Sequence, residues 1–146
     1  MLNMDPITLR AALAQLQQAT RDHVLWQENL LRAIVCSLPF NSKEMAVDAH
    51  LNCRFGRWYY ERAPAELWGQ PVFAEIGGEH ERLHQVAARL LREVAAQAPI
   101  TREDFEDLLR GLGELRLKLD LLRDELASTL RNRDALTGAY DRAEML

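Results

Sequence analysis

Apolar residues recur along the first part of the chain at alternating four- and three-residue steps. The pattern follows the dipeptide Asp5-Pro6, which is typical of a helix start. This spacing places its members on one face of a helix, so we expect a long amphipathic helix that ends before Pro39. The members of this stripe are Leu9, Leu13, Leu16, Thr20, His23, Gln27, Leu30 and Ile34.

Two further helical patterns follow. Ser42 can cap a helix over about residues 43–62 that ends before Pro64, and its inner face is expected to hold Ala46, Ala49, Cys53, Gly56 and Tyr60. After a loop over residues 65–71, a third helix runs up to Pro99, with Gly77-Gly78 as a local weakness. Its inner face is expected to hold Phe73, Ile76, His80, Ala87, Leu90 or Leu91, and Val94.

A fourth long helix is expected to begin at Thr101, where residues 101–104 resemble a capping box. It carries an uninterrupted heptad seam of Phe105, Leu108, Leu112, Leu115, Leu119, Leu122 and Leu126. The apolar surface is widened by Leu109, Leu117, Leu121 and Leu130. A stripe of this width can face its own bundle on one side and a second chain on the other, so we expect a homodimer.

No segment shows the alternation typical of a strand, and short loops join the expected helices. The pattern therefore predicts an all-α fold, an antiparallel four-helix bundle with a long C-terminal coiled-coil-like helix.

Charge and cysteine content narrow the class of protein. The formal net charge of −4 gives no electrostatic case for a nucleic-acid partner. The two cysteines suggest no disulfide framework and suit a reducing compartment. The chain shows no signal peptide and no apolar run long enough to span a membrane, so we expect a cytoplasmic protein without a membrane partner.

Histidines and one cysteine fall on the inward faces of three expected helices. His23 lies on the first stripe, Cys53 on the second, and His80 and His84 lie four residues apart on the third. Buried imidazoles without partners cost free energy, and tetrahedral zinc accepts both imidazole nitrogen and thiolate sulfur. These four residues are therefore the candidate zinc ligands. His50 ranks fifth, as a rim or supporting group, and Cys36 is expected to be an inert apolar residue.

The same residues resemble a known family. The segments His23-Val24-Leu25-Trp26, Cys53-Arg54-Phe55-Gly56-Arg57-Trp58 and His80-Glu81-Arg82-Leu83-His84 are similar to the HxxW, CxFGxW and HxxxH signature of the chemoreceptor zinc-binding (CZB) domain. The resemblance covers about residues 20–130. It implies a dimeric four-helix bundle with zinc held by His23, Cys53, His80 and His84, and with Trp26, Gly56 and Trp58 as packing positions.

A second resemblance lies near the C-terminus. Residues 134–142, DALTGAYDR, resemble the opening segment of GGDEF diguanylate cyclase domains, usually close to DxLTGLxNR, with Ala139 and Asp141 as departures. We therefore expect a zinc-binding regulatory bundle over residues 1–130, followed at 131–146 by a linker and the start of a truncated GGDEF domain. The implied function is zinc-dependent control of a cyclase that converts GTP to cyclic di-GMP, with no catalytic residue in this chain.

Two other functions compete with this one. The segment His80-Glu81-Arg82-Leu83-His84 also matches HExxH, the zinc metallopeptidase motif, in which Glu81 would be the general base. No His or Cys follows His84, so a downstream third ligand of either type is absent from the sequence. A metal-free helical interaction module is the other alternative, and it would leave the inward histidines unexplained.

Overall fold

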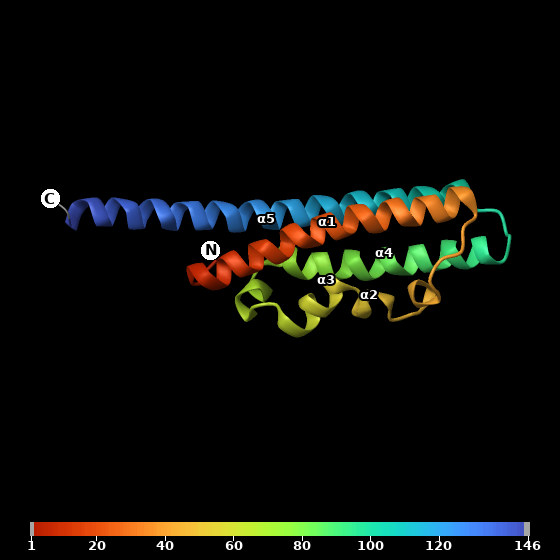
Figure 1. Ribbon diagram of the computed structural model, residues 1–146, viewed down its shortest axis with the longest axis horizontal. Coiled ribbons are helices and arrows are strands. Elements are labelled where there is room, and N and C mark those ends of the chain that lie inside the picture. Colours follow the sequence, from red (N-terminus) through yellow and green to blue (C-terminus); the bar gives the residue numbers. More distant parts are fainter. Residues whose placement is uncertain (1, 145–146) are drawn as a thin grey trace.

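Three long helices, α1 (Pro6–Cys36), α4 (Pro71–Ala95) and α5 (Arg102–Glu144), run side by side in the computed structural model (Figure 1). The structure describes residues 2–144, and side chains only up to residue 133. Successive long segments run in opposite directions, and no strand occurs among the described residues. The all-α fold is therefore confirmed. The described part of the chain also contains no helix that is both long and apolar enough to cross a membrane.

Two of the long helices, α1 and α5, begin at the predicted capping signals. Asp5 accepts a hydrogen bond from the Thr8 amide at 2.9 Å, and Pro6 occupies the first turn of α1. The Thr101 hydroxyl accepts a hydrogen bond from the Asp104 amide at 3.1 Å, which is one of the two bonds of a capping box, while the Asp104 carboxylate accepts a bond from Arg89. Side chains thus satisfy amides that a helix N-terminus leaves without a backbone partner.

The second segment differs from its prediction, because it is not one continuous helix. It consists of four short pieces: η1 (Ser42–Met45), α2 (Ala49–Asn52), α3 (Arg54–Arg57) and the π-helical turn η2 (Trp58–Arg62). A fifth piece, the 3-10 helix η3 (Ala65–Gly69), lies where a loop was expected. Asn41, not Ser42, provides the first cap, by accepting a hydrogen bond from the Lys43 amide. These pieces form a broken layer beside α4 (Figure 1).

The break in the second segment occurs at Cys53, whose backbone is extended with φ −74° and ψ 161°. This conformation ends α2 and begins α3, so the expected inner face over residues 43–62 loses its register. Tyr60 is consequently half-exposed rather than inward, whereas Trp58 and Tyr59 are buried. The Tyr59 hydroxyl donates a hydrogen bond to the Phe73 carbonyl at 2.6 Å and lies against Gly77, where a Cβ would collide with it.

The leucine seam of α5 packs inside the bundle of its own chain. Its members from Leu108 to Leu126 are at most 4% exposed, whereas Leu109, Leu117 and Leu121 are 45–54% exposed. The start of the chain also packs on α5: Leu2 and Met4 are buried, and the Arg133 guanidinium donates a hydrogen bond to the Leu2 carbonyl at 3.0 Å. The backbone stays helical beyond residue 130 to Glu144, and the side chains of the GGDEF-like stretch 134–142 lie outside the described residues.

Candidate metal centre

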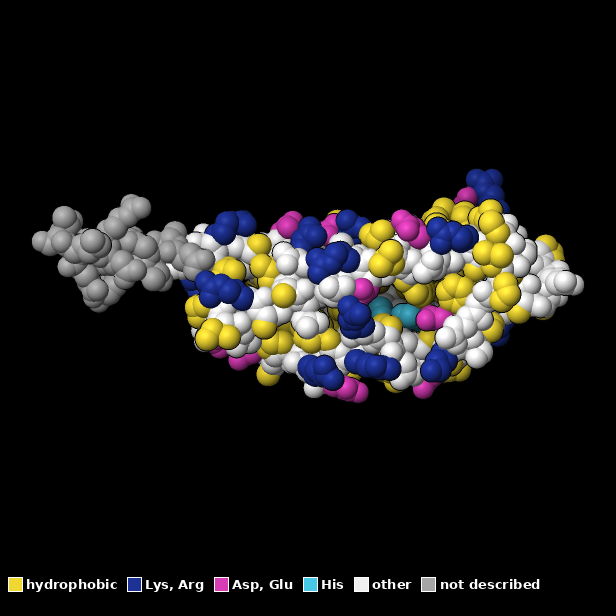
Figure 2. Space-filling model, in the orientation of Figure 1, with side chains coloured by type: hydrophobic (Ala, Val, Ile, Leu, Met, Phe, Trp, Pro, Cys, Tyr) yellow, Lys and Arg dark blue, Asp and Glu magenta, His cyan; other side chains and the backbone are white. Residues whose placement is uncertain are grey.

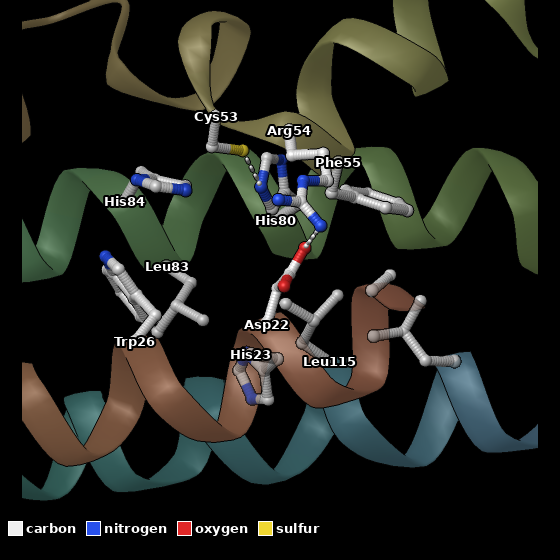
Figure 3. A pocket seen from close by; sticks show the side chains of 12 residues that line it. Asp22, His23, Trp26, Cys53, Arg54, Phe55, His80, Leu83, His84 and Leu115 are labelled. Atoms are coloured by element: carbon white, nitrogen blue, oxygen red, sulfur yellow. Dashed lines mark hydrogen bonds and ion pairs between the residues drawn. The ribbon is translucent and has the colours of Figure 1, made fainter. Parts of the chain in front are cut away.

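Three of the four predicted ligands lie together. One donor atom each from Cys53, His80 and His84 falls within 4.8 Å of the others. The Cys53 sulfur lies 3.2 Å from His80 Nε2. Two ligands on a tetrahedral zinc ion would have their sulfur and nitrogen about 3.5 Å apart, from bond lengths of about 2.3 and 2.05 Å. The observed spacing is therefore close to one edge of such a tetrahedron, and Figure 3 shows the three side chains converging.

The two histidines owe their arrangement to the regular helix α4. Their four-residue spacing places both rings on one face, with centroids 4.6 Å apart. The Trp26 ring of α1 lies 5.0 Å from the His84 ring, and its indole N–H donates a hydrogen bond to Glu44 of η1 at 3.1 Å. Trp26 therefore packs against a candidate ligand, in agreement with its expected packing role.

Cys53 owes its position to an irregular backbone. Its sulfur accepts a hydrogen bond from the Gly56 amide at 3.2 Å, and this contact caps α3. Gly56 is buried, and a Cβ at this position would collide with the carbonyl of His50. The absence of a side chain at Gly56 thus allows the backbone of α2 to fold closely over α3, which brings Cys53 to face α4.

Burial keeps the clustered donors uncharged. It lowers the pKa of His80 to about 2 and that of His84 to about 4, and the neighbouring histidines act in the same direction. Burial likewise raises the pKa of the Cys53 thiol. At neutral pH both imidazoles therefore offer lone pairs, and a bound cation would take up the Cys53 thiolate with release of a proton.

His23 lies on α1 and lines the same cavity, which has a volume of about 290 Å³, but it is outside the group of three. Figure 3 shows its ring extending toward α5 rather than toward Cys53. Its Nε2 atom is buried without a hydrogen-bond partner. Burial lowers the pKa of His23, while hydrogen bonding with the Leu112 backbone opposes that shift. His23 is thus a neutral donor next to the cavity.

His50 is also buried, and its Nδ1 atom has no hydrogen-bond partner. Its Nε2 atom lies 3.8 Å from the Glu81 carboxylate, and its ring contacts Tyr60 with centroids 6.1 Å apart. It does not line the cavity that the other three histidines share. This placement agrees with a supporting position for His50.

Unpartnered nitrogen atoms test whether a metal fits this site. At this cavity His84 Nδ1 and His23 Nε2 are buried without a hydrogen-bond partner, and His80 presents its Nε2 atom to the Cys53 sulfur. Buried polar groups without partners are rare and require an explanation. A soft thiol and neutral imidazoles are the donor set that zinc prefers. The residues present therefore fit zinc.

Two charged residues at the cavity were not predicted from the sequence. Asp22 of α1 and Arg54 of α3 both line it and form an ion pair with Nη1 and Oδ2 3.5 Å apart. Each is the immediate neighbour of a candidate ligand, Asp22 of His23 and Arg54 of Cys53. Their positions next to candidate ligands in the sequence could have indicated that both residues lie at the cavity. In Figure 2 histidine side chains are visible at the bottom of a hollow that acidic and basic side chains border.

Comparison with known protein families identifies the domain that this part of the chain forms. Residues 23–91 match the sequence model of the chemoreceptor zinc-binding domain family, and this range includes Cys53, His80, His84 and His23. The chain contains a CZB domain. No curated protein and no solved structure matches the chain.

A CZB domain is a sensory zinc-binding domain without catalytic activity, so the expectation that this part of the chain is not an enzyme is confirmed. Its cofactor is zinc, and Cys53, His80 and His84 form a group able to hold the ion. The position of Glu81 also weighs against the metallopeptidase alternative. Its carboxylate lies beside His50, whereas a general base would have to face a metal-bound water.

Proposed function

We propose that one zinc ion binds each chain through His23, Cys53, His80 and His84 in a closed tetrahedral site. The supporting observation is the convergence of Cys53, His80 and His84 in a cavity that His23 also lines with an unpartnered Nε2 atom. In this proposal the His23 side chain turns from α5 toward the other three when the metal binds. Four protein ligands close a zinc site, as is usual where the metal has a structural or regulatory role.

Elemental analysis and X-ray absorption test this assignment. Purified protein should contain about one zinc per chain, with three nitrogen donors at about 2.0–2.1 Å and one sulfur at about 2.3 Å. A spectrum with only nitrogen and oxygen donors would remove Cys53 from the site. A fourth donor that is oxygen, unchanged in a His23→Leu variant, would show that water completes the site and that His23 is not a ligand.

Substitution of each histidine by leucine ranks the histidines by their contribution to zinc affinity. His80→Leu or His84→Leu should weaken zinc binding by at least about one hundred-fold, because loss of a ligand exceeds the 10–100-fold typical of a supporting residue. His50→Leu is the matched control, since His50 is as buried as the ligands but lies beside Glu81 outside the cavity lining. An equal loss for His50→Leu, measured by competition with a chelator, would contradict the assignment.

We further propose that zinc occupancy controls an attached diguanylate cyclase. The resemblance of residues 134–142 to a GGDEF domain supports this output, and the helical backbone from Arg102 to Glu144 supplies a continuous connection. No candidate ligand lies on α5, but Leu115 and Leu119 of this helix line the metal cavity beside His23. Zinc would therefore act on α5 through packing at these leucines.

The cyclase proposal has two direct tests. Synthesis of cyclic di-GMP by the full-length protein should change when zinc is removed, and a His80→Leu variant should no longer respond. Hydrogen exchange of this domain should also differ with and without zinc over residues 115–130 of α5. Identical protection of these residues in both states would exclude this route, and the site would then be a structural clamp.

We propose a cytoplasmic homodimer as the assembled form. Its support is the row of exposed leucines on α5, namely Leu109, Leu117 and Leu121, which remain outside the bundle after the heptad seam is buried. Replacing Leu117 and Leu121 with Glu should yield a folded monomer, as judged by sedimentation and circular dichroism. The same change at the buried Leu115 and Leu122 should unfold the chain, and monomeric unmodified protein at high concentration would exclude the dimer.

A further inference from the structure

The rim of the metal cavity carries an ion pair that joins two of the elements bearing candidate ligands. Asp22 is on α1, one residue before His23, and Arg54 is on α3, one residue after Cys53. Both line the cavity, and Figure 3 shows the pair extending across the space in front of His80. The contact thus connects the α1 side of the cavity with the α3 side.

The two partners differ in how firmly they are held. Asp22 is about two-thirds buried: its Oδ1 atom accepts a hydrogen bond from Gln18 at 2.9 Å, while its Oδ2 atom is buried without a hydrogen-bond partner. The Arg54 side chain is 67% exposed, so it is free to swing into solvent. Asp22 is therefore the fixed partner, and Arg54 is the part that moves.

We propose that the Arg54–Asp22 ion pair is a latch across the mouth of the metal cavity. A zinc ion or a chelator passes faster when Arg54 leaves Asp22, so the pair affects the rate of metal exchange rather than the affinity. This inference rests on the proposed zinc site and adds the path by which the metal enters and leaves it. The hollow in Figure 2 is the corresponding opening on the molecular surface.

The size of the effect follows from the strength of such a pair. Partly exposed ion pairs contribute little, and opening this one should change a rate by about two- to five-fold. A latch slows entry and exit equally, because the closed pair narrows the same path for both directions. A purely electrostatic effect of Arg54 would instead repel the cation, so that removing its charge would speed uptake and slow release.

The test measures zinc release to a chromogenic chelator and zinc uptake by stopped flow. In Arg54→Gln both rates should rise about two- to five-fold, with the dissociation constant unchanged within about two-fold. Arg57→Gln is the matched control, because Arg57 is exposed on the same short helix but does not line the cavity. Slower release from Arg54→Gln than from the unmodified protein would overturn the latch.

The dependence of the zinc release rate on ionic strength provides a second test, which compares each protein with itself and so does not depend on differences in folding. Release from the unmodified protein should accelerate between low and high ionic strength as the pair is screened, whereas release from Arg54→Gln should not. Parallel salt curves for the two proteins would also overturn the latch. Absence of bound zinc in the unmodified protein would instead refute the proposed metal site, so the two failures are distinguishable.

Discussion

The helix α4 and the broken layer of residues 42–69 supply the metal cavity in opposite ways. α4 presents His80 and His84 through regular helical geometry, and every turn of the helix supports that placement. Cys53 instead lies at an extended residue between two four-residue helices, and its position depends on the close contact between His50 and Gly56. The long helices thus provide the fold, whereas the broken layer provides a ligand that small local changes can displace.

The largest expected effect tests the role of the long helices. Leu122 of α5 is fully buried, so Leu122→Ala should lower the free energy of unfolding by about 2–5 kcal/mol through lost burial and a cavity. Leu121→Ala is the control, since the Leu121 side chain is 54% exposed and the change should cost less than about 0.5 kcal/mol in the monomer. Urea denaturation measures both. Equal losses would mean that α5 is not packed as described.

A substitution in the broken layer, Gly56→Ala, is expected to cause a smaller loss of stability together with weaker zinc binding. In Gly56→Ala the new Cβ would meet the backbone carbonyl of His50, so α2 must move away and carry Cys53 with it. We expect about 1–3 kcal/mol of destabilisation and markedly weaker zinc binding. Thermal denaturation and zinc titration measure the two effects. Unchanged zinc affinity would show that the close contact does not position Cys53.

Substitution of an exposed glycine of α4, Gly78, should have the opposite effect on stability. Gly78 is exposed, and a Cβ there would meet no atom within 4 Å. Gly78→Ala should therefore stabilise the chain by about 0.5–1 kcal/mol, because alanine favours the helix and restricts the unfolded state. The melting temperature should rise while zinc binding stays the same. A fall in either quantity would contradict the view that α4 is a regular, independent support.

The smallest effect on the fold is expected from Cys53→Ala. The core lies among the long helices, so the zinc-free variant should keep its helical content and lose only about 0.5 kcal/mol of stability, the low end for a lost helix cap. Zinc binding should nevertheless weaken strongly, because the thiolate donor is gone. Circular dichroism with zinc titration separates the two. Complete unfolding would mean that the metal supplies most of the stability, as it does in small zinc domains.

The same contrast explains which features could be predicted from the sequence. Local sequence patterns located α1, α4 and α5, the N-terminal caps of α1 and α5, the buried seam of α5 and the inward faces of His80 and His84, since these depend on local regularity. It missed the breaks around Cys53, because they arise from the sulfur cap of α3 and from a backbone contact with Gly56. It also missed the Arg54–Asp22 pair, which joins residues 32 positions apart through tertiary packing.

The contact between Arg133 and Leu2 has a mechanical consequence for α5. The first residues of the chain hold this helix at a point near residue 133, while the bundle holds the part from Leu108 to Leu126. A rod clamped along most of its length resists bending but can still twist about its axis or slide lengthwise. Any motion that reaches the helical backbone beyond Arg133 should therefore arrive as torsion or axial slip, so paired spin labels should register rotation or translation of this segment rather than a change of tilt.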